Sequence, residues 1–576
     1  MKAAYRELTI PAIIVGILFG SLMCASFVYI SLKLGTGLGG SAVAAIMGFA
    51  ILKGALKNGT IVENNINQTV ASGINIASSG VAFTLPALFL LSVDDPTLAG
   101  FAATPFILAA MAGSFMGILL IIPLRKQMIE FERLRFPSGV AVATLLKSPG
   151  AGARQAKLLV GGFIISAIFT ALDRVGILPE ELDIGTLLGV PAHVPIVIAL
   201  SFANVGAGLL SGRGGLAFVA GGVLAWWVIS PATMAMGWIP DTGLEGQADF
   251  QMGALYSTMI RPLGIGMLVG GAIMGVIMSL PALKGAIKSL STVVQARSGG
   301  SGADAEELPS KILGIGILCG LIALFLAAML AGGEDLSIGQ AVGVAVVGGL
   351  WLGLAGLVVA QATGMTDISP ISGMALIAVT LMFFVTEGNV IASIMLGTAV
   401  CVGIGQCADM MQDLKTGHLV GSVPRRQQLV QFGVGWIGAP IAVGTVFLLW
   451  SAGPGGAGGF GPGTDLTAPQ AGALQAIVES LRSGNVPLEK YTVGTALGLA
   501  LGLYPIGGLG VLVGLAMYLP ISITLGYGVG CVMSIGLEKK LGKRWIGSTL
   551  VPVAAGFIVG EALTSLVIVL IKLGSA

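Results

Sequence analysis

The amino-acid sequence predicts an all-α polytopic integral membrane protein. Hydrophobic residues make up 55% of its 576 residues and charged residues only 10%, whereas soluble domains carry about 25% charged residues. The mean hydropathy is +0.96, and apolar stretches near the ~20 residues that cross a bilayer recur along the whole chain. We predict about 16 transmembrane or re-entrant helices, in two repeated halves related by a pseudo-two-fold axis.

The N-terminal half, residues 1–281, is expected to hold about eight of these helices. Its first apolar stretch follows two basic residues, as in a signal peptide, but it is too long for one and continues into more membrane, so we expect it to be the first span. The apolar stretches of this half are residues 10–32, 39–56, 76–92, 99–124, 158–172, 192–210, 214–236 and 262–281.

The C-terminal half, residues 311–576, is expected to hold about eight more. Residues 282–310, which contain Ser-Gly-Gly-Ser-Gly, are interpreted as a flexible cytoplasmic linker between the halves. The apolar stretches of the second half are residues 312–331, 338–360, 371–386, 389–406, 429–451, 469–482, 492–535 as a pair, and 546–571.

Charge in the loops predicts orientation. With eight spans in the first half, the basic loops fall on one side and the acidic loops on the other, so the N-terminus is expected in the cytoplasm of a cell whose cytoplasmic membrane holds the chain. The basic residues are Lys2, Arg6, Lys53, Lys57, Arg125, Lys126, Arg133, Arg135, Lys284, Lys288 and Arg297. The acidic loops contain Asp94 and Asp95, Glu180 to Asp183, and Asp241 to Asp249.

Three short matches in the same order suggest that the second half repeats the first. Residues 64–73 align with 408–417, the Phe-Pro at 136–137 aligns with the Ala-Pro at 468–469, and residues 271–274 align with 560–563. Duplicated halves are common in secondary transporters, whose substrate sits near the bilayer midplane between the repeats.

Three charges fall within nine residues directly after an apolar run, at Asp409, Asp413 and Lys415. A charge at the centre of a membrane helix costs roughly 2.5 to 3.5 kcal/mol, so such residues are expected to face protein or water. If residues 409–417 are helical, the two carboxylates share a face and Gln412 lies beside Asp409. Two close, partly desolvated carboxylates favour binding of a proton. Lys415, on another face, could neutralise a carboxylate or bind an anionic substrate group; alternatively this segment is a cytoplasmic helix end facing water.

The first half contains an equivalent polar cluster at Glu63, Asn64, Asn67 and Gln68. These side chains could supply hydrogen bonds to the amides or carboxylates of a peptide, with Glu63 as a further proton-coupling candidate. Alternatively, they satisfy one another between helices.

Glu561 lies alone near the middle of the last apolar stretch. An isolated carboxylate at membrane depth is a functional candidate by default, so Glu561 is a second candidate for proton coupling. The alternative is a structural partner for a buried arginine or for the backbone.

Proline beside small or polar residues marks three places where an apolar helix could break. Half-helices there would present N-terminal amides to an anionic ligand, although proline is also ordinary in the first turn of a helix. The substrate-binding candidates at these breaks are Pro137, Ser138, Gly139, Asp367, Ser369, Ser372, Pro469 and Gln470.

Other classes of function lack a signal in the sequence. The net charge of +2 and the absence of a basic run with aromatic residues argue against nucleic acid. The five cysteines fall in apolar segments without metal-type spacing, so we expect a reduced, buried set, no metal site and no cofactor. No Ser-His-Asp, His-Glu-x-x-His or phosphate-loop pattern indicates an enzyme.

These motifs resemble those of the oligopeptide transporter (OPT) family, including its yellow-stripe-like branch. The segments that carry the resemblance are Glu63-Asn64, Gln68 to Gly73, Arg135 to Gly139, Ser369 to Met374, Asp409 to Gly417 and Pro424 to Gln428. The chain does not begin with the long hydrophilic tail common in eukaryotic members, and so is similar to a prokaryotic member.

The resemblance implies proton-coupled symport of small oligopeptides, including glutathione-like peptides, or of metal-chelate complexes. Asp409 or Glu63 would take the proton, and the breaks would line a central cavity between the halves. Expected partners are the substrate, protons and the lipid bilayer, with a homo-oligomer as a further possibility. The alternative is a passive channel for cations or small solutes, in which glycine-rich breaks form a filter.

Overall fold

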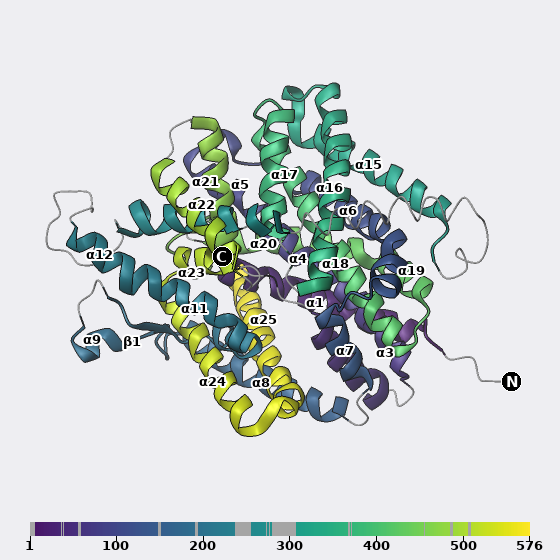
Figure 1. The fold of residues 1–576 in the computed structure, drawn as a ribbon, viewed down its shortest axis with the longest axis horizontal. Helices are drawn as coiled ribbons and strands as arrows, with labels where there is room; N and C mark the ends of the chain where they lie inside the picture. The colour runs from purple at the N-terminus through teal and green to yellow at the C-terminus, as the bar shows by residue number, and fades with distance from the viewer. Residues whose placement is uncertain are drawn as a thin grey trace. The chain divides into compact units, whose positions relative to one another are not determined.

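In the computed structural model, drawn as a ribbon in Figure 1, the chain forms two compact units. The first unit comprises residues 1–32, 36–156 and 276–482, and the second comprises residues 33–35, 157–275 and 483–576. Each unit therefore takes segments from both sequence halves; the repeat of the halves stays a prediction. The described residues are 6–575 except 36, 38–39, 56–58, 148–150, 191–193, 237–254, 272, 276, 279–306, 367–368, 370, 454–455, 484–487 and 505–508. Most of the predicted linker lies outside them.

Helices build the described part of the first unit. They are α1 (Ile10–Leu34), α2 (Ser41–Gly48), α3 (Ile61–Asn75), α4 (Ala77–Ala82), α5 (Pro86–Asp94), α6 (Ala103–Ile121), α7 (Pro137–Lys147), α15 (Ser310–Gly332), α16 (Ile338–Thr366), α17 (Ile371–Val385), α18 (Val390–Val420), α19 (Pro424–Val434), α20 (Gly438–Ser451) and α21 (Pro469–Ser483). The last residues of α1 and α21 belong to the second unit, and the first residues of α8 (Ala151–Arg174) belong to the first unit.

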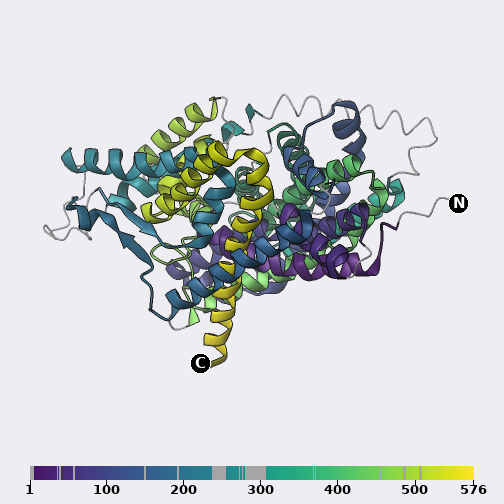
Figure 2. The same cartoon turned by 90° about the horizontal axis from the view of Figure 1, so that it is seen from below.

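The second unit combines helices with one small sheet. Its elements are α8 (Ala151–Arg174), β1 (Glu181–Asp183), α9 (Ile184–Leu188), β2 (Val197–Ala199), α10 (Phe202–Ser211), α11 (Leu216–Val223), α12 (Ser230–Ala235), α22 (Leu488–Gly502), α23 (Leu509–Tyr518), α24 (Ile521–Trp545) and α25 (Val551–Ser575). β1 and β2 pair antiparallel, with Glu181 opposite Ala199. Figure 2 shows α25 in yellow, running to the C-terminus.

The polytopic character predicted from composition is confirmed. In the described part of the chain, 11 helical segments are long and apolar enough to cross a membrane. One face of α15 leaves large apolar side chains exposed at helical spacing, as expected for a surface that lipid covers; they are Ile312, Ile315, Leu318, Ile322, Leu326 and Leu330. Shorter apolar helices accompany the long ones, and the number of about 16 stays a prediction.

Small residues allow α18, the almost wholly buried helix of the first unit, to approach α6 closely. Gly113 and Gly117 of α6 face Ala399 and Gly403 of α18, and a Cβ added at Gly117 would lie 2.1 Å from the carbonyl oxygen of Gly403. This spacing of four residues on both helices is the small-xxx-small pattern of membrane helix packing. The chain contains 90 glycines, and those at this crossing serve dense helix packing.

Replacing Gly117 by alanine is expected to destabilise the first unit by about 1–3 kcal/mol, because the new methyl group would meet backbone that cannot move aside. Gly314 of α15 is the matched control, since a Cβ there meets no heavy atom within 4 Å. Thermal denaturation of both variants in one detergent compares them. Equal midpoints for Gly117→Ala and Gly314→Ala would show that the crossing tolerates the methyl group.

The cysteines are unpaired, but they are not all buried as predicted. Cys24, Cys401, Cys407 and Cys531 are buried, whereas Cys319 is exposed on α15. The prediction was wrong for Cys319 because an apolar stretch shows membrane depth without showing which face turns toward lipid.

In two of the predicted acidic loops, hydrogen bonds to one aspartate favour its ionised form. The pKa of Asp95 is lowered by hydrogen bonds from Thr97 and Arg482, and the pKa of Asp183 is lowered by hydrogen bonds from Thr186. Because a lowered pKa stabilises the fold only while the group is ionised, these contributions are present at neutral pH and are lost as the pH falls through the folded-state pKa.

Candidate functional site

Two buried carboxylates lie one turn apart on α18. The helix starts at an Asn389 cap and continues without interruption to Val420, so the segment 409–417 is helical as predicted. Asp409 is 7% exposed and Asp413 is 1% exposed. The two side chains therefore share one face inside the first unit.

Helix α3 supplies the hydrogen-bond donors that meet these carboxylates. The Ser72 hydroxyl donates to Oδ1 of Asp409, and Nε2 of Gln68 donates to Oδ1 of Asp413. Ser41, at the start of α2, places its Oγ 2.9 Å from Oγ of Ser72 and 3.5 Å from Oδ1 of Asp413. The structure thus brings together the two polar clusters that the sequence placed in separate halves.

Helix α19 completes the surroundings with buried glutamines. Nε2 of Gln431 lies 3.3 Å from Oδ2 of Asp409, and Nε2 of Gln427 donates to the backbone oxygen of Asp413 at 2.9 Å. Sequence reasoning selected neither these glutamines nor Ser41 and Ser72. The available signal was the helical spacing of glutamines 427, 428 and 431 in a segment beginning Pro424-Arg-Arg.

The Asp409–Asp413 pair has no cationic partner among the described residues, where neither carboxylate forms an ion pair with Lys, Arg or His. Both oxygens of Asp409 accept hydrogen bonds. Oδ2 of Asp413 is buried and, within the described part of the chain, has no hydrogen-bond partner. Two buried negative charges without compensation are costly, and a proton on Oδ2 of Asp413 would remove one of them.

The remaining members of the first-half cluster serve contacts between helices. Glu63 forms a capping box with Thr60 at the start of α3 and accepts a hydrogen bond from Oγ1 of Thr9. Asn64 donates to the backbone oxygen of Ala45 at 2.9 Å, and Asn67 donates to that of Ala44 at 3.2 Å. The two asparagine bonds hold α2 against α3, and their acceptors are backbone oxygens of α2 rather than other members of the cluster.

The start of α7 at Pro137 lies against α18. A Cβ added at Gly139 would lie 2.5 Å from the backbone oxygen of Gln412, and Oγ1 of Thr416 donates to the backbone oxygen of Gly139 at 2.9 Å. Ser138 precedes this contact in α7, and Lys415 lies half-buried one helical turn from Gln412. The structure therefore groups these candidates around the C-terminal half of α18.

The breaks at Pro137 and Pro469 share one backbone conformation. Each proline is the first residue of its helix, and the residue before it, Phe136 or Ala468, has a positive φ of 43° or 47°. Non-glycine residues rarely adopt this left-handed region, and such strain persists only where surrounding contacts hold it. The two positions are those that the sequence repeat aligned.

The other candidates are not gathered at the acidic pair by any described contact. Oγ of Ser369 lies 2.5 Å from Oγ1 of Thr363, and Gln470 is buried in the first turn of α21. Ser372 falls in the first turn of α17. Asp367 lies outside the described residues.

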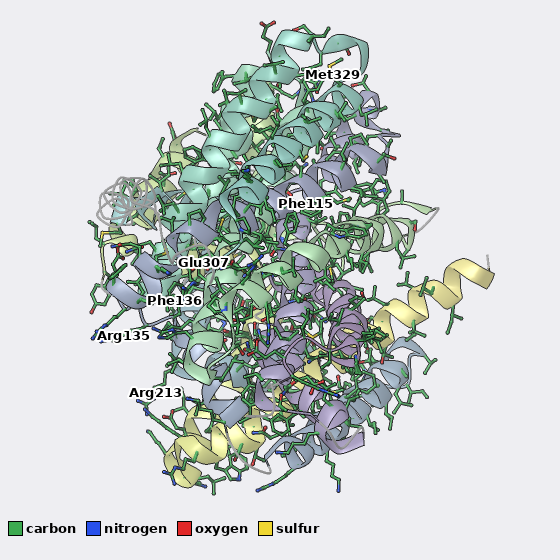
Figure 3. All side chains as sticks on the ribbon, turned by 90° about the vertical axis from the view of Figure 1, so that its right-hand side faces the viewer. Phe115, Arg135, Phe136, Arg213, Glu307 and Met329 are labelled. Atoms are coloured by element: carbon green, nitrogen blue, oxygen red, sulfur yellow. The ribbon has the colours of Figure 1, made fainter. Side chains whose placement is uncertain are left out.

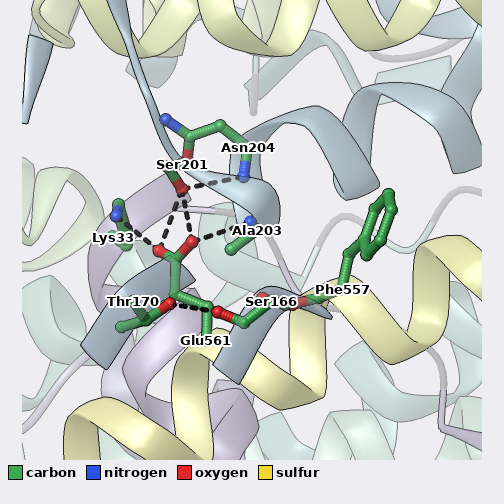
Figure 4. A network of polar contacts seen from close by, with 8 residues as sticks. All are labelled: Lys33, Ser166, Thr170, Ser201, Ala203, Asn204, Phe557 and Glu561. Carbon is green, nitrogen blue, oxygen red and sulfur yellow. Dashed lines mark hydrogen bonds and ion pairs between the residues drawn. The ribbon is translucent and has the colours of Figure 1, made fainter. Parts of the chain in front are cut away.

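Glu561 lies in a separate polar network within the second unit (Figure 4). Its carboxylate accepts from Nζ of Lys33 at 2.7 Å, from Oγ of Ser201 at 2.9 Å and from the backbone N–H of Ala203 at 2.9 Å. The charge of Glu561 is therefore compensated, unlike that of the aspartate pair. Sequence reasoning missed Lys33, which stands at the end of the first apolar stretch.

An apolar groove of about 480 Å³ opens on the first unit. The residues that line the groove are Phe115, Ile312, Ile315, Gly316, Cys319, Gly320, Ala323 and Phe432. Phe115 is labelled in Figure 3. None of the lining residues carries a charge, so the groove holds no partner for the charged groups of a peptide or a chelate.

Comparison with known proteins gives full-length similarity. The family model described as OPT oligopeptide transporter protein matches residues 7–572. A Haemophilus influenzae protein named as an oligopeptide transporter is 28% identical, with 94% of this chain and 92% of the relative aligned. A Saccharomyces cerevisiae protein named likewise is 24% identical over 76% and 77%. An Arabidopsis thaliana protein named as a metal-nicotianamine transporter is 33% identical over 25% of this chain and 22% of the relative.

Proposed function

Because the chain belongs to the OPT oligopeptide transporter family, whose members are transporters rather than enzymes, we propose that it carries small oligopeptides or metal-chelate complexes by symport with protons. The peptide branch of this proposal rests on the family and on the bacterial relative. The chelate branch rests on the partial similarity to the plant protein. We place the chain in the cytoplasmic membrane with its N-terminus in the cytoplasm, on the distribution of basic loop residues.

The observation that carries proton coupling is the uncompensated pair Asp409 and Asp413. Of the four carboxylates considered from the sequence, Glu561 forms an ion pair with Lys33, and Glu63 belongs to the capping box of α3. Asp409 and Asp413 accept hydrogen bonds but form no ion pair with a cation among the described residues. One carboxylate of the pair can bind a proton, which removes a buried negative charge, and release it again, as the carboxylates of proton relays inside membranes do.

The substrate is proposed to pass beside this pair. Gln412 and Lys415 on α18, with Pro137, Ser138 and Gly139 on α7, would contact its amides. The strained residues before Pro137 and Pro469 support these breaks as places where the path opens and closes, because strain of this kind concentrates at functional positions.

Uptake into proteoliposomes with an inward proton gradient tests the proposal. The panel is glutathione, trialanine, and iron(III) with and without nicotianamine. We expect saturable uptake of at least one peptide or chelate that stops when a protonophore removes the gradient. Unsaturable flux that ignores the gradient would support the passive channel instead, and no uptake across the panel would count against both branches.

A further inference from the structure

The N-terminus of α10 lies inside the second unit and is built to hold a negative charge. The extended segment β2 ends at Ala199, and Ser201 then caps the helix by accepting a hydrogen bond from the backbone N–H of Asn204 at 3.1 Å. The first N–H groups of a helix lack acceptors within the helix, and the helix dipole favours an anion there. In secondary transporters such half-helix ends receive the anionic groups of substrates.

A carboxylate already occupies this position. The Glu561 side chain reaches it from α25 and meets three different donors, the Lys33 ammonium, the Ser201 hydroxyl and the Ala203 N–H (Figure 4). Lys33 is 9% exposed, Glu561 4% and Ala203 0%. We call this set of donors the carboxylate cradle. Its donors recognise a carboxylate as such, and no part of the arrangement depends on the remainder of the glutamate.

One buried side chain beside the cradle is left without partners. Asn204 is 0% exposed, and within the described part of the chain neither its Nδ2 nor its Oδ1 has a hydrogen-bond partner. Figure 4 shows its carboxamide next to Ser201, turned toward the side of the network where Lys33 lies. Across from it, α24 has a glycine, and a Cβ added at Gly526 would lie 3.8 Å from Nδ2 of Asn204. A buried amide that makes no hydrogen bond is costly, so it requires an explanation.

We propose that the carboxylate cradle binds the carboxylate of the transported ligand, that Glu561 is the internal carboxylate which occupies it in this structure, and that Asn204 hydrogen-bonds the incoming ligand. The proposal rests on the proposed function, because a peptide and an amino-acid-type chelator both carry carboxylates. Exchange of one carboxylate for another keeps the charge of Lys33 neutralised throughout. Asn204 then has the partner that Glu561 does not provide.

Removing the carboxylate of Glu561 allows binding of a free carboxylate to the cradle to be measured without a transport assay. In the full-length Glu561→Ala protein, sodium acetate at neutral pH is expected to raise the thermal unfolding midpoint saturably, by about 2–4 °C over sodium chloride of equal ionic strength. Lys33→Met/Glu561→Ala should not respond, and Asn204→Leu/Glu561→Ala should need more acetate. If Glu561→Ala folds only when purified in acetate, that rescue is the same positive result. No effect of acetate, or an equal effect on the Lys33→Met double variant, would overturn the proposal.

Transport by the wild-type chain tests whether the ligand itself uses the cradle. Trialanine and trialaninamide differ only in the terminal carboxylate, so uptake of trialanine should exceed that of trialaninamide at least tenfold, and Asn204→Leu should raise the KM for trialanine. Equal uptake of the two peptides would contradict ligand binding at the cradle. If neither peptide is taken up, the peptide branch of the proposed function is wrong. The acetate experiment then tests by itself whether the carboxylate cradle binds a carboxylate.

Discussion

Uptake driven by a proton gradient is expected to fall to the level of empty liposomes when Asp413 is replaced by asparagine, whereas Asp409→Asn should retain part of it. Asparagine preserves the volume and still accepts the hydrogen bond from Gln68, but it cannot take up a proton. Asp413 should be the more sensitive position because its Oδ2 is buried without a partner, while both oxygens of Asp409 accept hydrogen bonds. The measurement is initial uptake in proteoliposomes with and without an inward proton gradient.

Two controls make this prediction specific. Glu63→Gln should keep gradient-driven uptake, since glutamine can replace glutamate in the capping box at the start of α3. Exchange of labelled for unlabelled substrate without a gradient should survive in Asp413→Asn, because binding and reorientation do not need the proton to be released. Gradient-driven uptake that persists in Asp413→Asn and Asp409→Asn alike would exclude the pair as the coupling site.

Loss of Arg125 is expected to destabilise the protein by about 3–5 kcal/mol, because it leaves a buried carboxylate without its cation. Arg125 is 1% exposed; its Nε lies 2.5 Å from Oε1 of Glu307 and one of its terminal nitrogens lies 2.8 Å from Oε1 of Glu130. Glu307 also accepts from Gln428, whose Oε1 accepts from the N–H of Leu308 at 2.9 Å. Figure 3 shows Glu307 above Phe136 in the first unit.

Denaturant unfolding in detergent, followed by tryptophan fluorescence, measures the effect of Arg125→Met. The double variant Arg125→Met/Glu307→Gln should recover much of the loss, because it removes the unpaired charge as well. Arg213→Met is the matched control: Arg213 is 66% exposed and lies 3.8 Å from Glu538, so its loss should cost about 0–1 kcal/mol. A cost for Arg125→Met as small as that of the control would show that the buried pair contributes little.

Local sequence patterns correctly predicted that residues 409–417 are helical and that Asp409 and Asp413 share a face. An apolar run followed by aspartates four residues apart places both on one face of a helix, whatever packs against it. The sequence pattern of α18 did not show which hydrogen-bond donors surround the two carboxylates. Ser41, Ser72 and Gln431 reach the carboxylates only because α2, α3 and α19 pack there, and the spacing of polar residues within each segment does not show which carboxylate it will meet.

The sequence by itself determined the class of the protein, because membrane-spanning helices satisfy their backbone within one continuous segment and leave a composition that can be read locally. It also identified the two polar clusters and the family motifs. Only the tertiary structure decided which carboxylate is compensated. Lys33 and Glu561 are 528 residues apart in the chain yet 2.7 Å apart in space. The aspartate pair beside α3 has no such partner among the described residues, and since the cost of a buried charge depends on what surrounds it, that distinction cannot be read from spacing.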